Sequence, residues 1–422
     1  MKNELKKLFC DIALYSSFIS FYLLYIKEFY KKFRLKPEYL LLLIPFIWAF
    51  FANFLYIKGW ARDSLWDINV VYCADLAYSN NLDPYNDWFE NPGCMESIPL
   101  QYTYLKLLLD FLPFSMFEYD FFEKIWVFLL GIMLITYAFI TKKLFQLEIS
   151  IIFIVFFISF LFQGANMVAL QSGNISTLVY LIVFIGIYFL KSPKYQILFF
   201  VCLALATFVK FHLGILLLMP FVLNNKFNYR GYIVYFSILF SLFYINYLLH
   251  GEFLSKWLTN LAYVDWGLKP YYSDISFLKT LWVNKIRDVE FNAIVKLLLA
   301  PLFIINLILF KKFLNNKVSH DEKDNILIAL CSLAFILILP RLKVYDFLFV
   351  SCVSLKIYID SVKTITNKLV KIRIASSIII LIFYLSFIYW RPQWDGDNKS
   401  YFHVLSILFL YQGLLYFKLK SK

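Results

Sequence analysis

Apolar stretches of about 16 to 20 residues recur along nearly the whole chain, and each ends in Lys, Arg, Asn or Pro. A helix needs about 20 apolar residues to cross the hydrocarbon core of a bilayer, so each stretch has the length of a span. The composition agrees, because 61% of the 422 residues are hydrophobic and 16% are charged, against roughly 25% charged residues in ordinary soluble domains. We therefore predict an all-α polytopic membrane protein, a single integral membrane domain over residues 1–422 with about 10 to 13 transmembrane helices.

The apolar stretches predict where the crossings lie. Residues 9–26 carry several polar side chains and lead into a basic segment, so we expect an uncleaved interfacial helix there. The crossings themselves are expected near residues 39–57, 124–140, 149–168, 175–190, 232–249, 292–310, 326–340, 344–361, 375–390 and 401–417.

Lys and Arg gather in short clusters on one side of these spans, which the positive-inside rule assigns to the cytoplasm. This distribution explains the net charge of +13 without a nucleic-acid partner. The opposite side receives residues 58–123, 250–291 and 391–400. The first of these segments holds eleven of the 28 acidic residues and only three basic ones, a net charge of −8. It is predicted to be a large extracytoplasmic loop of a protein in the plasma or bacterial inner membrane.

Residues 195–223 form one apolar run of 29 residues that Lys210 and His212 interrupt, and both of its flanks are basic. Both flanks should therefore be cytoplasmic. Two short helices forming a hairpin satisfy this condition, with the turn at residues 210–212 deep in the bundle or at its far side. Such a broken helix is tolerated at membrane depth where it lines a protected cavity.

Cysteines and acidic pairs give no sign of a metal site. The six cysteines include no CxxC motif and no Cys/His spacing suited to zinc. Cys73 and Cys94 both lie in the acidic loop, where they could pair in an oxidising compartment, but we expect buried free thiols. Asp395 and Asp397 belong to a DGD sequence that is expected to form a turn. No metal and no cofactor are predicted.

Asp63 and Asp67 follow the first firm span closely, so they lie near the membrane surface and share a face if the segment is helical. A carboxylate in this position can accept a proton from a substrate hydroxyl. Acidic loop residues can equally be solvated or cap a helix, and spacing alone does not decide between these roles.

Four basic side chains are expected at or near the outer membrane level: Lys210 and His212 in the hairpin, and Arg341 and Lys343 after an apolar span. Charge inside a membrane marks a functional site by default. Lys210, Arg341 and His212 could neutralise the negative charge that a phosphate leaving group gains in a dry pocket. Alternatively, Arg341 and Lys343 extend to the interface, and His212 is a satisfied histidine within the bundle. Of these residues, Lys210 is the one that a purely structural role explains least well.

The segment DINVVYCADLAYSNNLDPY, residues 67–85, resembles a block of glycosyltransferase family 87 in which Asp, VY, a small-residue helix and PY follow in this order. The segments IPLQYTYLKLLLDFLPF, GNISTLVYLIVF, TFVKFHLGILLL and PRLKVYDFL continue in the family's order, and the resemblance covers about 300 residues. Asn174 stands where the family usually has Gln, and the Gly before the last PY element is missing.

The resemblance implies a bundle like that of the GT-C superfamily, with an outward-facing active site and a polyprenyl-phosphate-linked sugar as donor. Asp67 stands at the position of the family's proposed base, while Asp63, Tyr72, Tyr85 and Asn174 are expected to bind substrate. The implied reaction transfers a hexose or pentose, mannose-like in kind, to a hydroxyl of a glycan or glycolipid acceptor with inversion. A glycan polymerase or ligase and a membrane transporter are the alternatives.

Overall fold

The computed structural model describes residues 65–85, 94, 104–112, 114–151, 154, 169, 172–224, 227–265, 289–315, 317–338, 347–364 and 397–420. These residues belong to one compact unit, Ala49–Lys422. Within these ranges every regular element is a helix, which confirms the all-α prediction for this part of the chain. The elements are α3 (Trp66–Ser79), α4 (Leu107–Phe111), η2 (Phe114–Met116), α5 (Tyr119–Phe145), α8 (Ser176–Leu190), α9 (Gln196–Val209), η3 (Phe211–Leu217), α10 (Leu218–Asn224), α11 (Tyr229–Asp265), α13 (Val289–Leu314), α14 (His320–Ile338), α15 (Phe347–Thr364) and α17 (Asp397–Lys420).

Two described helical segments, Tyr119–Phe145 and Tyr229–Leu258, are long and apolar enough to cross a membrane. They coincide with two of the predicted crossings, and both expose large apolar side chains such as Phe128 and Phe240. Extensive exposed apolar surface on a helix is typical of contact with lipid or with a partner. The predicted crossings at 39–57 and 375–390, and nearly all of that at 149–168, lie outside the described residues.

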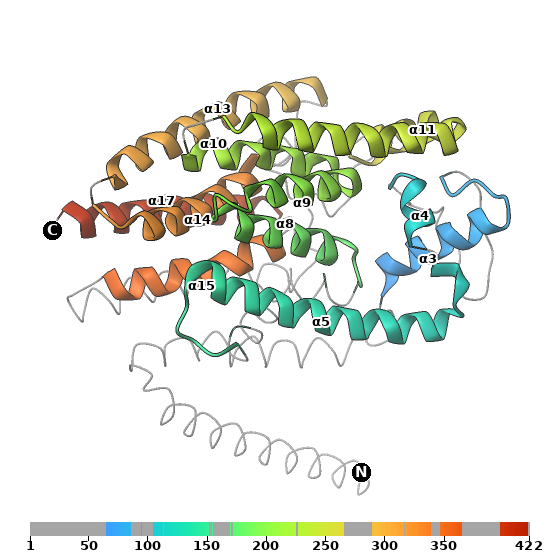
Figure 1. Cartoon of the computed structure of the whole chain (residues 1–422), viewed down its shortest axis with the longest axis horizontal. Coiled ribbons are helices and arrows are strands. Elements are labelled where there is room, and N and C mark those ends of the chain that lie inside the picture. The colour runs from blue at the N-terminus through green and yellow to red at the C-terminus, as the bar shows by residue number, and fades with distance from the viewer. Residues whose placement is uncertain are drawn as a thin grey trace, which may run out of the picture. The chain divides into compact units, whose positions relative to one another are not determined.

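The helices α8, α9 and α11 pack side by side, with α9 in the middle (Figure 1). Small residues permit the close approach of these backbones. A Cβ added to Gly186 of α8 would lie 3.0 Å from the Cβ of Cys202 on α9, and one added to Gly231 of α11 would collide with the ring of Phe200. Glycines on α8 and α11 therefore allow both of these helices to lie close to α9.

The apolar run at 195–223 reverses direction, as predicted from its basic flanks. The helix α9 ends at Val209, and Lys210 leaves helical geometry with φ −133° and ψ 92°. The seven-residue 3₁₀ helix η3 then packs back against α9. The chain that follows the run returns to the start of α9, because Asn228 Nδ2 donates to Gln196 Oε1 at 3.4 Å. Runs of 3₁₀ helix longer than three or four residues are uncommon.

Both predicted outer loops contain more helix than expected. The acidic loop includes α3, α4 and η2, and α5 begins at Tyr119 rather than near residue 124. The second loop was predicted to begin at residue 250, but α11 continues to Asp265 through a kink at His250, where φ is −138° and ψ is 33°. The fall in hydropathy at this point marks the end of the apolar segment, whereas the helix itself continues.

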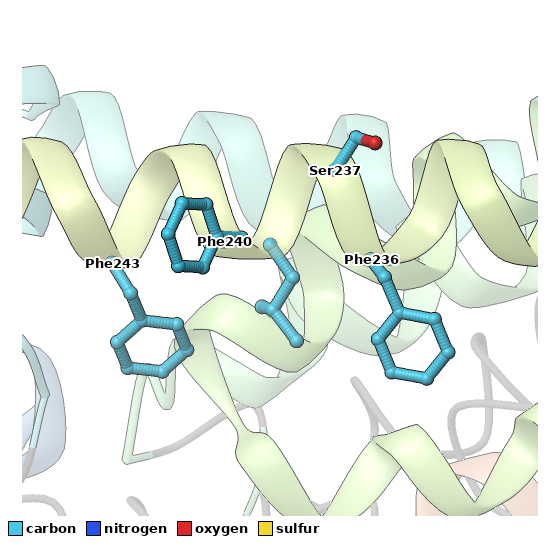
Figure 2. A pocket seen from close by; sticks show the side chains of 5 residues that line it. Phe236, Ser237, Phe240 and Phe243 are labelled. Carbon is cyan, nitrogen blue, oxygen red and sulfur yellow. The ribbon is translucent and has the colours of Figure 1, made fainter.

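One face of α11 carries an open apolar groove of about 680 Å³. In Figure 2 the rings of Phe236 and Phe243 project below the helix, the ring of Phe240 lies over its ribbon, and Ser237 projects above it. The ring centroids of Phe243 and Phe208 are 5.8 Å apart, and Phe208 precedes the helix break at Lys210 by two residues. Phe243, which lines the groove, therefore contacts the last turn of α9 before the break. The groove is lined by Phe236, Ser237, Leu239, Phe240 and Phe243.

Candidate functional site

The candidate site begins at the amino terminus of α3, where the backbone has an unusual arrangement. Leu65 precedes the helix in the left-handed region, with φ 63°, and makes no side-chain cap. The first N–H groups of a helix have no acceptor within the helix itself. Here the carbonyl of Ser172 accepts hydrogen bonds from the backbone N–H groups of Asp67 at 2.9 Å and Ile68 at 3.3 Å. A segment distant in sequence thus caps α3.

Gly173 allows this segment to lie against α3. Its φ is 64°, a conformation that side chains with a Cβ rarely adopt. An added Cβ would lie 2.7 Å from Leu65 Cδ2 and 3.1 Å from Trp126 Nε1. The Trp126 indole N–H donates to the Gly173 carbonyl at 2.9 Å. Conformation and lack of space therefore both require glycine here.

Asn174 joins this segment to the predicted base. Its Nδ2 donates to Asp67 Oδ2 at 2.8 Å. Its Oδ1 accepts hydrogen bonds from the backbone N–H of Ser176, at 2.8 Å, and from the Ser176 hydroxyl. Asn174 is buried and Asp67 is half-buried. Both residues were predicted as site residues from the sequence, but their contact was not. Asn174 was expected to bind substrate, whereas in the structure its amide donates a hydrogen bond to Asp67.

The carboxylate of Asp67 is well placed for chemistry. It lies in the first turn of α3, where the helix dipole favours negative charge. An ionised carboxylate has lone pairs for about four hydrogen bonds on its two oxygens. The contact with Asn174 uses Oδ2, so Oδ1 has the capacity to accept a proton or a hydrogen bond from a ligand.

Lys210 lies near the same end of α8. Its side chain is 8% exposed, and its Nζ is 5.5 Å from the centroid of the Tyr180 ring. Tyr180 follows Ser176 by one helical turn, a rise of about 6 Å, on the same face of α8. The first two turns of α8 therefore contact both the Asn174 segment and the lysine at the helix break. His212 is half-buried next to Phe211.

The two predicted substrate tyrosines make contacts within the outer segment. Tyr72 donates its hydroxyl to the carbonyl of Phe117 at 2.9 Å. Tyr85 donates to the carbonyl of Tyr104 at 2.8 Å. Both tyrosines are 5% exposed, and these bonds brace the chain around α3. The other predicted site residues, Asp63, Arg341 and Lys343, lie outside the described residues.

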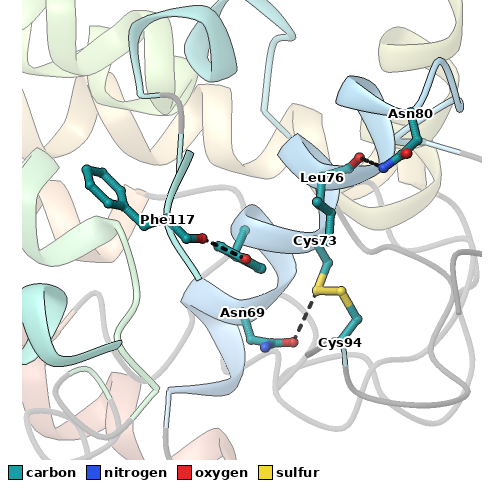
Figure 3. Close-up of a disulfide and its surroundings, with 7 residues drawn as sticks. Asn69, Cys73, Leu76, Asn80, Cys94 and Phe117 are labelled. Carbon is teal, nitrogen blue, oxygen red and sulfur yellow. Dashed lines mark hydrogen bonds between the residues drawn. A yellow bond between two sulfur atoms is a disulfide. The ribbon is translucent and has the colours of Figure 1, made fainter. Parts of the chain in front are cut away.

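The prediction of free thiols at Cys73 and Cys94 was wrong, because the two form a disulfide (Figure 3). Their Cα atoms are 5.8 Å apart, and both residues are buried. Pairing depends on the chain returning Cys94 to the face of α3 that carries Cys73, which no local pattern reveals. The bond tethers the helix that carries Asp67. Disulfides persist mainly in oxidising compartments.

An ion pair and a hydrogen bond between side chains join α11 to the outer segment. Lys256 Nζ lies 2.8 Å from Asp83 Oδ2, and His250 Nε2 lies 2.6 Å from Asp110 Oδ2. Asn246 Oδ1 also accepts a hydrogen bond from the Leu107 N–H at 3.0 Å. These contacts of α11, from Asn246 to Lys256, thus fix the positions of α4 and of the segment that follows α3.

Lys106 lies between two aromatic rings beside these pairs. Its Nζ is 3.6 Å from the centroid of the Tyr78 ring and 3.5 Å from that of Phe253. Burial lowers the pKa of Lys106 to about 8, although nearby acidic groups, led by Glu252, oppose the shift. Sequence reasoning did not select Lys106, and the aromatic residues that surround it come from separate helices.

Asp67, Asn174, Ser176 and Lys210 are thus organised around the start of α8. Among the described residues, no group of three or more His, Cys, Asp or Glu side chains could hold a metal ion. The chemistry of the site is that of a carboxylate and a separate buried cation. No protein-family model matches the chain, and no curated protein matches it.

Proposed function

We propose that this chain is a polytopic membrane glycosyltransferase whose active site faces away from the cytoplasm. It would transfer a hexose or pentose, mannose-like in kind, from a polyprenyl phosphate to a hydroxyl of a glycan or glycolipid. The observation that carries the proposal is the hydrogen bond from Asn174 to Asp67, made beside the helix whose next turn contacts Lys210. Asp67 would act as the base and Lys210 as the cation in a single displacement at the sugar's anomeric carbon.

Lysines at the helix ends support the proposed orientation, in which the active site faces away from the cytoplasm. Lys191 Nζ donates to the carbonyl of Leu144 at 3.0 Å and to Asn325 Oδ1 at 2.8 Å, which joins the ends of α5 and α8 to the start of α14. Lys311 likewise donates to backbone carbonyls at the end of α10. A basic end is expected on the cytoplasmic side, and a disulfide on the oxidising side. One cysteine of the disulfide, Cys73, lies on α3, the helix that carries Asp67.

In the proposed reaction Asp67 accepts the proton of the acceptor hydroxyl. The acceptor oxygen forms a bond to the anomeric carbon as the bond from that carbon to the phosphate oxygen breaks. The electron pair of the broken bond leaves with the polyprenyl phosphate. A single displacement from the opposite face inverts the anomeric centre. Asp67 is then the general base, a role worth about 10² to 10⁴ in rate.

The departing phosphate gains negative charge, which Lys210 is suited to stabilise. A buried cation acts more strongly than a solvated one, because the surrounding dielectric constant is low. Lys210 is 8% exposed and lies at the break between α9 and η3. Arg341 and Lys343 are proposed to assist on the basis of the sequence alone.

The groove on α11 suits the apolar chain of such a donor. Its lining is apolar except for Ser237, and Phe243 contacts Phe208 close to Lys210. A prenyl chain in this groove would have its phosphate end near the helix break. The groove and the cation together favour a lipid-linked phosphate over a soluble one.

A direct test measures sugar transfer in membranes supplied with radiolabelled polyprenyl-phosphate sugar. Asp67→Asn should lose at least about 100-fold in rate, whereas Asp120→Asn, an exposed acid in the first turn of α5, should keep normal transfer. Lys210→Ala should lose much more activity than Lys143→Ala, which changes an exposed lysine. Full transfer by a normally expressed Asp67→Asn variant would remove Asp67 from the mechanism.

A membrane transporter is the second candidate, because the break at Lys210 resembles the discontinuous helices that line transport pathways. Purified protein in proteoliposomes distinguishes the two functions. Uptake of a solute without any sugar transfer would favour the transporter. Transfer from the lipid-linked donor in the absence of a gradient would favour the enzyme.

A further inference from the structure

We infer that Asn174 is a positioning residue that orients Asp67 for proton transfer, and that Ser176 in turn orients Asn174. This role rests on the proposed glycosyl transfer. It differs from the expected role of Asn174 in binding the donor, because the described contacts of its amide are with Asp67 and Ser176.

The orientation of the Asn174 amide follows from its partners. The backbone N–H of Ser176 can only donate, so the atom that it meets at 2.8 Å must be the amide oxygen. The amide nitrogen must then face Asp67, whose Oδ2 lies 2.8 Å away. A backbone group therefore determines which end of the amide meets the carboxylate.

This donor has two consequences for Asp67. The hydrogen bond fixes the rotation of the carboxylate about its Cβ–Cγ bond, so its two oxygens keep one orientation. It also uses one lone pair of Oδ2, which leaves Oδ1 with the greater capacity to accept a proton. The carbonyl of Ser172 holds the backbone of Asp67, so main chain and side chain are both positioned by the 172–174 segment.

The same helix also positions the cation. Ser176 and Tyr180 lie one turn apart on α8, and the Tyr180 ring lies beside Lys210. Helix α8 therefore links the position of the base Asp67 to that of the cation Lys210. Loss of the Asn174 contact should affect the base and leave Lys210 in place, so binding of the phosphate should change little.

The test compares Asn174→Ala with Asn325→Ala. Asn325 is equally buried and accepts a hydrogen bond from Lys191 at the basic end of the molecule. Asn174→Ala should lower kcat roughly tenfold and leave KM nearly unchanged, because it removes one hydrogen bond to the carboxylate of Asp67. Asn325→Ala should leave kcat unchanged. Asn174→Gln, which keeps the amide donor, should recover part of kcat.

A second measurement does not require activity. Hydrophobic carbodiimides react with carboxyl groups, and peptide mass spectrometry measures the modification of Asp67 at one fixed pH. Modification of Asp67 should be faster in Asn174→Ala, because its carboxylate is no longer held by the Asn174 amide. Asn174→Leu, nearly the same size but without a donor, replaces the alanine variant if that variant does not fold.

The outcomes separate this role from the proposed function. If Asp67→Asn abolishes transfer while Asn174→Ala changes neither kcat nor the rate of Asp67 modification, the positioning role is wrong and the function stands. If the parent chain transfers no sugar but Asn174→Ala changes the rate of Asp67 modification, the glycosyltransferase proposal is wrong and the Asn174–Asp67 relation stands.

Discussion

Removal of the disulfide between Cys73 and Cys94 should loosen α3 selectively. The bond closes a loop with a sequence separation of 21 residues. In the chain-entropy model, a loop of this length stabilises the folded state by about 3 kcal/mol at 25 °C. Both cysteines are buried, so the double substitution Cys73→Ala and Cys94→Ala replaces them without burying new polar groups.

Hydrogen exchange of the α3 amides in detergent-solubilised protein provides the assay. A loss of about 3 kcal/mol corresponds to roughly 100-fold faster exchange where α3 opens by unfolding of the loop. The control is Cys202→Ala, which removes an unpaired cysteine of α9 and should leave exchange in α3 unchanged. Equal exchange in the double variant and the control would refute the reasoning, because the tether would then contribute nothing to α3.

Two further predictions concern the same end of the molecule. Burial lowers the pKa of Lys106 from 10.5 to about 8, so between these pH values the unfolded chain binds a proton that the folded chain has released. The free energy of unfolding should therefore rise with pH in this window, and denaturant titrations of Lys106→Met should lack that increase. Gly173→Ala should cost at least about 1 kcal/mol in stability, from its left-handed conformation and the contact with Leu65, and should reduce transfer. Gly131→Ala, where nothing lies within 4 Å of the added Cβ, should be neutral or stabilising in the same thermal melts.

The helices were predictable where a segment's own composition decides its structure. The predicted crossing at 124–140 lies within α5, and that at 175–190 coincides with α8 to within one residue. The reversal at Lys210 followed from the basic residues on both sides of one apolar run. The extension of α11 beyond His250 was missed because its stabilising partners, Asp110 and Asp83, belong to another segment.

The candidate site was predictable in part. Asp67 was selected from its position after an apolar span and from the family resemblance, and Asn174 from the resemblance alone. The requirement for Gly173 was missed, although a Gly-Asn pair before a helix is a recognisable turn signal. Its reason appears only with the side chains of Leu65 and Trp126 in place.

The sequence by itself determined that the chain forms apolar helices and where one of them must reverse, because hydropathy and flanking charge are properties that a segment carries wherever it packs. The tertiary structure alone decided that Asn174 holds Asp67, 107 residues away, and that Cys94 pairs with Cys73. Such contacts depend on which helix ends lie next to each other in the fold. Packing between segments, such as the close fit of Gly173 against Leu65 and Ile68, decides this, and the residue pattern within a single segment does not.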